Sequence, residues 1–193
     1  MGRLIYLMGP SGSGKDSLLA ALQRLPEQPL TVAHRYITRA AGAGGENHIE
    51  LSDAVFTHRR ERGLFALDWQ AHQLRYALGI EIDLWLLRGV DVIVNGSRAH
   101  LAQARRRYGE QLMPLCLAVA PGVLNQRLRQ RGRETAGEIE GRLARAREYQ
   151  QDLPLDCLIL NNDGPLADTL KTMLALLPPP ATLPASHPRD SQS

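Results

Sequence analysis

A glycine-rich run near the start of the chain holds the clearest set of residues that could do chemistry. Glycines let consecutive backbone N–H groups turn inward around an anion, and a lysine at the start of the next helix adds positive charge. The spacing is nearly the G-x-x-x-x-G-K-[ST] pattern of loops that bind nucleotide phosphates. Lys15 is the expected catalytic cation, because its ammonium can follow charge between the β and γ phosphates of ATP. The predicted loop comprises Gly9, Pro10, Ser11, Gly12, Ser13, Gly14, Lys15, Asp16 and Ser17.

The loop departs from the usual pattern at one position, where a Ser or Thr hydroxyl normally contacts Mg²⁺. Asp16 stands there, and Ser17 follows it. A carboxylate is a good hard ligand for Mg²⁺, so Asp16 or Ser17 is expected to hold the metal. The carboxylate also puts a negative charge beside a triphosphate, which is unfavourable unless a cation lies between them. We therefore expect a strict requirement for Mg²⁺.

Arginine carries nearly all of the positive charge, since Lys15 and Lys171 are the only lysines among the 23 basic residues. Many arginines fall within residues 127–147, around Gly132. An arginine fork grips phosphate in a bidentate manner, and such a segment can close over phosphates during their transfer. We expect an arginine-rich loop and helix that form a lid, with Arg131 and Arg142 catalytic and Arg127 near the nucleotide. The alternative is a compositional bias that puts arginine on every solvated surface, with Arg142 pairing Glu138 one helical turn away.

The bulk composition is that of an ordinary single domain. The chain has 193 residues, 44% hydrophobic and 22% charged, and its net charge of +3 does not indicate a nucleic-acid partner. No apolar run is long enough to span a bilayer, so we expect no membrane partner and a cytoplasmic location. Cys116 and Cys157 lie in apolar runs and are interpreted as buried hydrophobes. The sequence sets no expectation of oligomeric state.

Short apolar strands alternate with helical patterns along the chain, and the first strand and helix flank the phosphate loop. This alternation predicts an α/β fold, a three-layer sandwich of the P-loop kinase kind with a mainly parallel sheet. Thr135 and Glu138 form a capping-box pattern at the start of one helix. The expected strands cover residues 4–8, 31–37, 90–94, 112–120 and 157–160, and the expected helices cover residues 15–25, 135–150 and 165–177.

Residues 38–80 interrupt the alternation, so they are predicted to form a small substrate-binding region inserted in the domain. Within them, residues 40–45 are rich in glycine and are expected to be flexible. Residues 178–193 hold five prolines and no core-forming pattern, which predicts a disordered tail. The predicted domain is therefore residues 1–177.

Several motifs occur in the order found in guanylate-kinase-like proteins, which the chain resembles over about residues 4–177. A closer resemblance is to the ribose 1,5-bisphosphate phosphokinase family. The motifs shared with guanylate-kinase-like proteins are the phosphate loop, Thr38-Arg39, Gly45-Glu46, residues 127–133 with Arg142, and Asn161-Asn162-Asp163. The closer resemblance rests on residues 34–39, Glu46-Asn47-His48, Ala66-Leu67-Asp68-Trp69, residues 94–98 and residues 131–134.

The closer resemblance implies ATP-dependent phosphorylation of ribose 1,5-bisphosphate to 5-phospho-α-D-ribose 1-diphosphate, within phosphonate breakdown. Its partners are then ATP and a small phosphorylated sugar. The acceptor phosphate would already be largely anionic at pH 7, so the enzyme must bring two anions together. Arg39 and Arg98 are the expected ligands of the acceptor phosphates, helped by His48 and Tyr76. Glu46 either orients an arginine or meets the substrate.

Two further site residues follow from the resemblance. Asn95 stands where guanylate kinases place an acidic residue after the central strand, and it is expected to contact substrate. Asn161 is expected near the adenine of ATP, through its backbone or its side chain. Trp69 and His72 are interpreted as core residues.

Two alternatives to a sugar-phosphate kinase stay open. One is a nucleoside monophosphate kinase, and the other is a non-catalytic interaction module on the same scaffold. The positions with which guanylate kinases read guanine hold Leu67 and Leu78, which cannot pair with a base edge and so disfavour the first. The intact Gly14-Lys15 pair and the arginine-rich segment disfavour the second.

Overall fold

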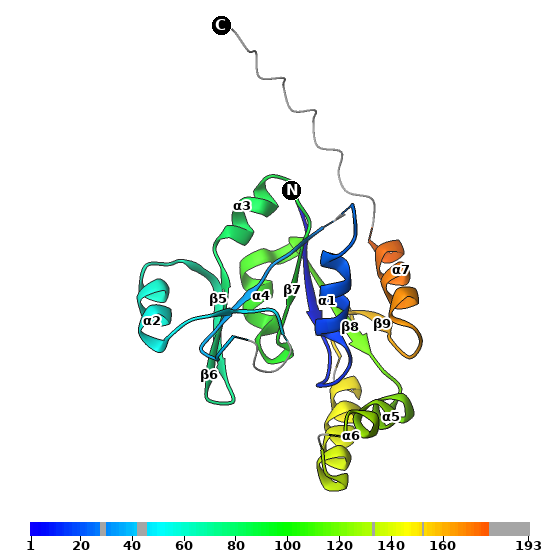
Figure 1. Ribbon diagram of the computed structural model, residues 1–193. Helices are drawn as coiled ribbons and strands as arrows, with labels where there is room; N and C mark the ends of the chain where they lie inside the picture. The colour runs from blue at the N-terminus through cyan, green and yellow to red at the C-terminus, as the bar shows by residue number, and fades with distance from the viewer. Residues whose placement is uncertain (28–29, 42–45, 133, 152, 178–193) are drawn as a thin grey trace, which may run out of the picture.

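The computed structural model describes residues 1–27, 30–41, 46–132, 134–151 and 153–177, and within them two sheets and seven α-helices (Figure 1). The strands are β1 (Leu4–Met8), β2 (Thr31–Val32), β3 (Arg35–Ile37), β4 (Ile49–Glu50), β5 (Phe65–Ala71), β6 (Leu74–Gly79), β7 (Val92–Asn95), β8 (Leu112–Ala118) and β9 (Leu158–Asn161). The helices are α1 (Lys15–Gln23), α2 (Asp53–Glu61), α3 (Glu81–Leu87), α4 (Leu101–Tyr108), α5 (Pro121–Arg131), α6 (Ala136–Gln151) and α7 (Leu166–Leu176), with short 3₁₀ turns at Arg98–His100 and Gly109–Gln111.

The larger sheet is parallel throughout, in the order β2-β7-β1-β8-β9, which confirms the predicted α/β fold. Its central strand β1 is buried along its whole length, and its side chains alternate between two cores. Tyr6 faces the cluster that includes α4, whereas Ile5 and Leu7 face the cluster that includes α1 and α7. The sheet is therefore covered on both faces, and the loops at its carboxyl ends are free to form a site.

The second sheet has the order β4-β3-β6-β5 and comes mostly from residues 38–80. Strands β3 and β6 are antiparallel, as are β5 and β6, and α2 packs Phe56 against this sheet. His72 and Gln73 join β5 to β6 with φ of 49° and 62°, as a tight hairpin turn requires. In Figure 1 this sheet and α2 lie to one side of the parallel sheet, while α5 and α6 project below it.

The predicted strand over residues 31–37 is wrong, because the chain changes sheets within it. Thr31 and Val32 pair with β7, and the N–H of Ala33 still donates to the carbonyl of Ile93 at 3.0 Å. From Arg35 onward the chain pairs with β6. An apolar run does not specify its pairing partner, so the sequence pattern missed the crossing.

The prediction of a loop in the arginine-rich segment is wrong as well, because most of this segment is helical. Residues 127–131 complete α5, and Gly132 ends that helix in the left-handed conformation with φ of 62°. The capping box at the start of α6 is confirmed, because the N–H of Thr135 donates to Glu138 Oε2 at 2.7 Å and the N–H of Glu138 donates to Thr135 Oγ1 at 3.4 Å. The other predicted elements are present with ends shifted by up to two residues.

Some predictions fall outside the described residues. These are the flexibility of residues 42–45, the part of the arginine-rich segment at Arg133, and the tail at residues 178–193. Across the described segments, no helix combines the length and the apolar character needed to cross a membrane.

Candidate active site

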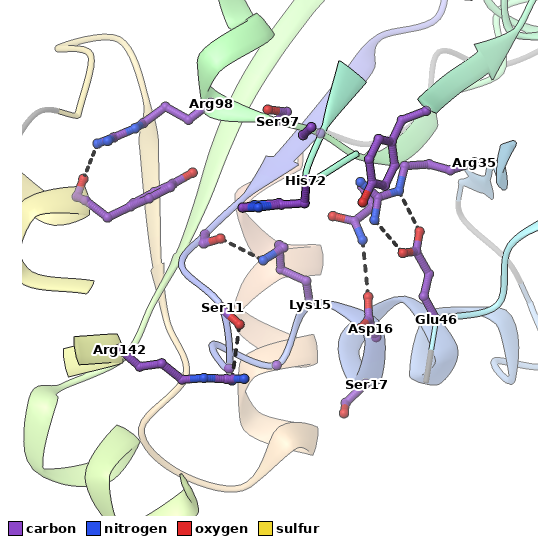
Figure 2. A pocket seen from close by; sticks show the side chains of 18 of the residues that line it. Ser11, Lys15, Asp16, Ser17, Arg35, Glu46, His72, Ser97, Arg98 and Arg142 are labelled. Carbon is purple, nitrogen blue, oxygen red and sulfur yellow. Dashed lines mark hydrogen bonds and ion pairs between the residues drawn. The ribbon is translucent and has the colours of Figure 1, made fainter. Parts of the chain in front are cut away.

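A cleft of about 750 Å³ opens at the carboxyl ends of β1 and β7, between the second sheet and α6 (Figure 2). Most of the predicted site residues line it, although they come from widely separated parts of the chain. Those that line the cleft are Gly9, Ser11, Gly12, Gly14, Lys15, Asp16, Ser17, Arg39, Glu46, Tyr76, Asn95, Arg98, Arg131 and Arg142. The predicted residues outside its lining are Pro10, Ser13, His48, Arg127 and Asn161.

The phosphate loop connects β1 to α1 and places Lys15 at the first helical position. Gly14 precedes it with φ of 98°, and a Cβ there would lie 2.6 Å from Asn162 Nδ2, so glycine is needed for two reasons. The Lys15 Nζ donates to the carbonyls of Gly9 at 2.7 Å and of Pro10 at 3.3 Å. Burial lowers the pKa of Lys15, and the Asp16 carboxylate opposes that shift. The ammonium is thus held at the loop, where a phosphate could replace the carbonyls.

Two buried hydrogen bonds connect the loop to the residues around Asn162. Asn162 Nδ2 donates to the carbonyl of Ser13 at 2.7 Å, and the hydroxyl of Thr169 donates to Asn162 Oδ1 at 2.8 Å. Ser13 is fully buried, and it is its backbone carbonyl that Asn162 holds. Asn161 is exposed and lies outside the cleft. The neighbouring residue Asn162, which the sequence did not single out, positions the loop.

Asp16 and Ser17 face the cleft from the first turn of α1, next to Lys15. Asn95 Nδ2 donates to Asp16 Oδ1 at 3.2 Å, which orients this carboxylate. Burial, and then the negative charge of Glu46, raise the pKa of Asp16 above its usual value. No three His, Cys, Asp or Glu side chains of the described residues gather as a metal site. Mg²⁺ in kinases commonly takes one or two protein oxygens and completes its shell with phosphates and water, which this donor set fits.

The paired helices α5 and α6 bring two arginines to the cleft. Arg142 on α6 donates from Nη1 to Ser11 Oγ at 3.3 Å, while its Nη2 lies 3.2 Å from Glu134 Oε1. Arg131 also lines the cleft. Arg127, in contrast, donates to the carbonyl of Gly164 at 3.5 Å and points elsewhere. The salt bridge of Arg142 is with Glu134, which sequence reasoning had not selected.

Opposite the phosphate loop, two arginines share one carboxylate. Arg35 binds both carboxylate oxygens of Glu46, with Nε at 2.6 Å from Oε1, and Arg39 Nη2 lies 3.6 Å from Oε2. The Glu46 side chain is only 10% exposed, so these ion pairs are shielded from bulk water. Glu46 therefore orients arginines, one of the two roles expected for it. Arg35 was missed from the sequence, although it lies closer to Glu46 than Arg39 does.

His48 lies in the protein interior behind Glu46 and Arg39. It is buried, and its ring nitrogens lie 3.0 Å from the carbonyl oxygens of Glu46 and Arg39. It does not line the cleft. Its predicted contact with substrate therefore has no support from the geometry, and its position favours a structural role.

The segment after β7 lines the cleft next to α5 and α6. Gly96 is required there, because a Cβ would lie 2.4 Å from the Tyr6 ring. Arg98 extends from this segment to α6, where its guanidinium lies 4.2 Å above the Tyr149 ring and Nη1 donates to the Tyr149 carbonyl at 2.8 Å. Arg98 thus links the parallel sheet to α6 at the edge of the cleft, and Tyr149 is a further cleft residue that the sequence did not indicate.

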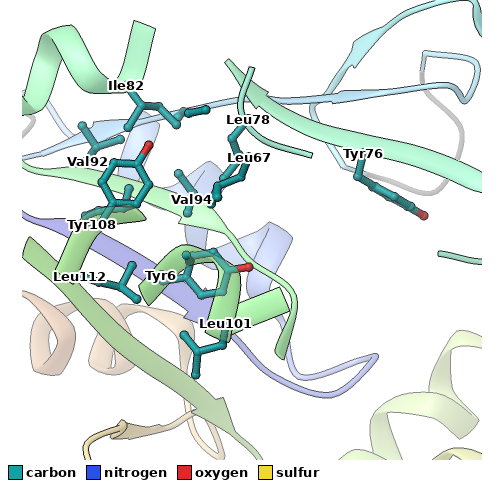
Figure 3. Packing of buried hydrophobic residues seen from close by; sticks show 14 of the residues in the cluster. Tyr6, Leu67, Tyr76, Leu78, Ile82, Val92, Val94, Leu101, Tyr108 and Leu112 are labelled. Carbon is teal, nitrogen blue, oxygen red and sulfur yellow. The ribbon is translucent and has the colours of Figure 1, made fainter. Parts of the chain in front are cut away.

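The β5–β6 hairpin forms an aromatic wall on the side of the cleft that belongs to the second sheet. Trp69 and Tyr76 stack with ring centroids 5.7 Å apart, and both line the cleft. His72, at the tip of the hairpin, also lines it and points inward in Figure 2, so its interpretation as a core residue is wrong. Leu67 and Leu78 form the next cross-strand pair along the same hairpin and lie in the core (Figure 3). They cannot contact a bound base.

Eight curated proteins similar to this chain share one name, ribose 1,5-bisphosphate phosphokinase PhnN. One from Yersinia pestis is 62% identical over 177 residues, which are 92% of this chain and 92% of that protein. One from Pectobacterium atrosepticum is 60% identical over 92% of this chain and 95% of its own length. A more distant one from Desulfomicrobium baculatum is 50% identical, again over 92% of this chain and 95% of its own length.

Solved structures support the fold. A guanylate kinase from Anaplasma phagocytophilum superposes with a TM-score of 0.65 at 15% identity, over 91% of this chain and 84% of that one. A sugar kinase from Janibacter aligns with a TM-score of 0.50 at 19% identity, over 91% of this chain and 94% of that one. No protein-family model matches the chain. At these identities the structural likeness concerns the fold alone.

Proposed function

The chain belongs to the ribose 1,5-bisphosphate phosphokinase family, and from that premise we propose that it transfers the terminal phosphoryl group of ATP to ribose 1,5-bisphosphate. The product is 5-phospho-α-D-ribose 1-diphosphate, and the other product is ADP. One observation carries this proposal. A single cleft has a phosphate loop with Lys15 on one wall and the paired guanidiniums of Arg35 and Arg39 on the facing wall.

The bond changes are simple, and the protein supplies mainly charge and position. An oxygen of the 1-phosphate bonds to the γ-phosphorus of ATP, and the bond from that phosphorus to the β,γ-bridging oxygen breaks. The attacking phosphate has a second pKa near 6, so it is already largely dianionic at neutral pH and needs no strong general base. The main barrier is the repulsion between two anions, which positive side chains reduce.

On the nucleotide side, the backbone N–H groups of the loop bind the phosphates, and the N-terminal end of α1 points toward them. Lys15 exchanges its carbonyl partners in the loop for oxygens of the β and γ phosphates. Arg142 already contacts the loop through Ser11, so a small movement of its side chain reaches the transferring phosphoryl group. Arg131 lines the same part of the cleft and adds a second positive charge.

On the acceptor side, Arg35 and Arg39 bind the phosphates of the sugar. Glu46 fixes their guanidiniums before substrate arrives, so that little side-chain entropy is lost on binding. Tyr76 and His72 border the same space. Arg98, on the segment after β7, joins the parallel sheet to α6 through the Tyr149 carbonyl at the edge of this space.

Asp16 and Ser17 would hold Mg²⁺, with Asn95 orienting the carboxylate. The ion would neutralise charge on the β and γ phosphates when it is bound. The proximity of Asp16 to the expected phosphates supports a strict metal requirement, because an unshielded carboxylate there would repel the nucleotide.

A substrate comparison tests the proposal. Purified protein is incubated with ATP, Mg²⁺ and either ribose 1,5-bisphosphate or GMP, and the products are identified by phosphorus NMR. We expect a diphosphate on carbon 1 of the sugar and no GDP. Turnover of GMP without turnover of the sugar would overturn the proposal and favour a nucleoside monophosphate kinase.

A further inference from the structure

The side of the cleft that the second sheet forms, opposite the phosphate loop, is called the acceptor wall. Four side chains form a continuous row along it. Trp69 and Tyr76 are directly opposite each other on β5 and β6, and their rings are nearly parallel, with an angle of 6° between them. The Arg35 guanidinium lies 5.1 Å from the centroid of the Tyr76 ring. The His100 ring stacks on Trp69 at 5.6 Å and 25°. The row therefore runs from Arg35 through Tyr76 and Trp69 to His100.

The order of the strands places these partners on different sides of the two rings. Strand β6 lies between β3 and β5, so Arg35 and Trp69 approach Tyr76 from opposite sides. Strand β5 is at the edge of its sheet, and His100 reaches Trp69 from the segment after β7 in the other sheet. Trp69 is 6% exposed and Tyr76 is 9% exposed, although both border the cleft. Their faces are therefore covered by neighbours, and mainly their edges meet the cleft.

The layer next to the row offers no free hydrogen-bonding group, because the Tyr6 hydroxyl in it already donates to the Ser97 carbonyl at 3.1 Å and accepts from the Ser97 N–H at 3.0 Å. Leu67 and Leu78 are the next cross-strand pair on the same face of the hairpin, and they pack together with Tyr6 and Val94, as Figure 3 shows. These side chains are at most 3% exposed, and close packing around them resists any tilt of the two rings. A base that entered the cleft would find neither a free ring face nor a polar partner in this layer.

Proteins bind bases by stacking them on aromatic faces and by pairing with their polar edges. A sugar phosphate needs neither, because cations and hydrogen bonds hold its phosphates and hydroxyls. We propose that Trp69 is a specificity-determining residue, which keeps nucleobases out of the acceptor site by covering the face of Tyr76 on which a base would stack. This inference rests on the proposed function for the location of the acceptor site, and it deepens that proposal.

Replacing Trp69 with Ala tests the inference directly. The change uncovers one face of Tyr76 and leaves room for a planar ring, so affinity for GMP or AMP should rise about tenfold, which is within the range for one base–aromatic stack. Binding is measured by titration calorimetry without ATP, so catalysis is not required. Trp85→Ala is the matched control, because Trp85 on α3 packs against the same core and lies outside the cleft. Folded Trp69→Ala protein with no gain in affinity would refute the inference.

A second measurement does not depend on how Trp69→Ala folds. Trp69 and Trp85 are the only tryptophans of the chain, so Trp85→Phe leaves Trp69 as the sole indole fluorophore. A base that stacks on an indole quenches its emission. We expect GMP and AMP to cause no saturable quenching in Trp85→Phe protein. Saturable quenching at concentrations that also saturate ribose 1,5-bisphosphate binding would overturn the inference, because it would show a free face on Trp69.

The two proposals fail in different ways. If the wild-type enzyme does not phosphorylate ribose 1,5-bisphosphate, the proposed function fails, while the absence of base quenching and the gain of Trp69→Ala still support a covered ring face. If the enzyme phosphorylates the sugar but Trp69→Ala gains no affinity for GMP or AMP, the specificity inference fails alone.

Discussion

The phosphate loop and the acceptor wall face each other across the cleft, and they present positive charge by different means. In the loop, consecutive backbone N–H groups and one ammonium come from residues 9–17. In the wall, guanidiniums come from Arg35 and Arg39 and are fixed by Glu46. The loop thus depends on a backbone path, whereas the wall depends on a network of side chains. A substitution in the wall should therefore change substrate binding gradually, and a substitution of the one loop cation should change the rate steeply.

The largest effect is expected for Lys15→Ala. Removing the ammonium leaves the charge on the γ-phosphoryl group uncompensated, so kcat/KM should fall about 10³-fold, or about 4 kcal/mol of transition-state stabilisation. Steady-state assays with both substrates measure this. Lys171→Ala is the matched control, because Lys171 is the only other lysine and is exposed on α7. If both variants kept wild-type activity, the role of the loop cation would be wrong.

Helix α6 supplies a second, smaller test of the nucleotide side. Arg142→Ala removes the guanidinium that contacts Ser11, and kcat should fall about 10²-fold because the transferring group loses a positive neighbour. Arg145→Ala, on the same helix but outside the main cleft, should change kcat less than about twofold. Equal losses in the two variants would indicate a general effect of positive charge on α6.

The acceptor wall is tested by Glu46→Gln. The amide keeps the shape of the side chain but not the charge that holds Arg35 and Arg39, so KM for ribose 1,5-bisphosphate should rise about tenfold while KM for ATP stays within about twofold. Glu50→Gln is the control, since Glu50 accepts a hydrogen bond from Ala41 on the exposed side of the same region. A fall in KM would mean that Glu46 competes with the substrate for the arginines.

The contrast between loop and wall also explains what the sequence could predict. Residues 9–17 are contiguous, and the conformation of the loop follows from its own glycines, so the spacing alone was sufficient to predict a glycine-rich turn between a strand and a helix. Arg35 was missed because its role depends on β3 pairing with β6, within a run predicted as one strand of the other sheet. His72 was missed because a hairpin turn, which no periodicity marks, brings it into the cleft.

Choices between neighbouring residues were also beyond the sequence. Asn161 and Asn162 are identical in type and adjacent, yet one is exposed and the other is buried against the loop. Arg127 and Arg131 lie one turn apart on α5, yet only Arg131 lines the cleft. The rotation of a helix about its axis and the twist at the end of a strand decide which of two nearby side chains faces the site. Both are set by tertiary packing.

The asparagine pair gives a stability test of the loop support. Asn162→Ala leaves the buried Ser13 carbonyl and the Thr169 hydroxyl without their partner, which should cost about 1–3 kcal/mol in the free energy of unfolding. Asn161→Ala should cost less than about 0.5 kcal/mol, because its side chain is exposed. Urea unfolding of both variants measures the difference. A larger cost for Asn161→Ala would show that the assignment of the two residues is reversed.

The smallest effect is expected at Asp16, the loop residue that feels the charge of Glu46 in the wall. Burial and the Glu46 charge raise the pKa of Asp16, so the folded state disfavours its ionised form. The resulting destabilisation of the folded state is absent at pH values where Asp16 is protonated in both states, and it grows as pH rises from the unfolded pKa to the folded pKa.

Asp16→Asn should therefore raise Tm slightly at pH 7 without added metal, and this gain should vanish in acid. In the Glu46→Gln background the gain should shrink, because one cause of the raised pKa is gone. A gain that is the same in both backgrounds would show that the two carboxylates are not coupled, and that loop and wall are electrostatically independent.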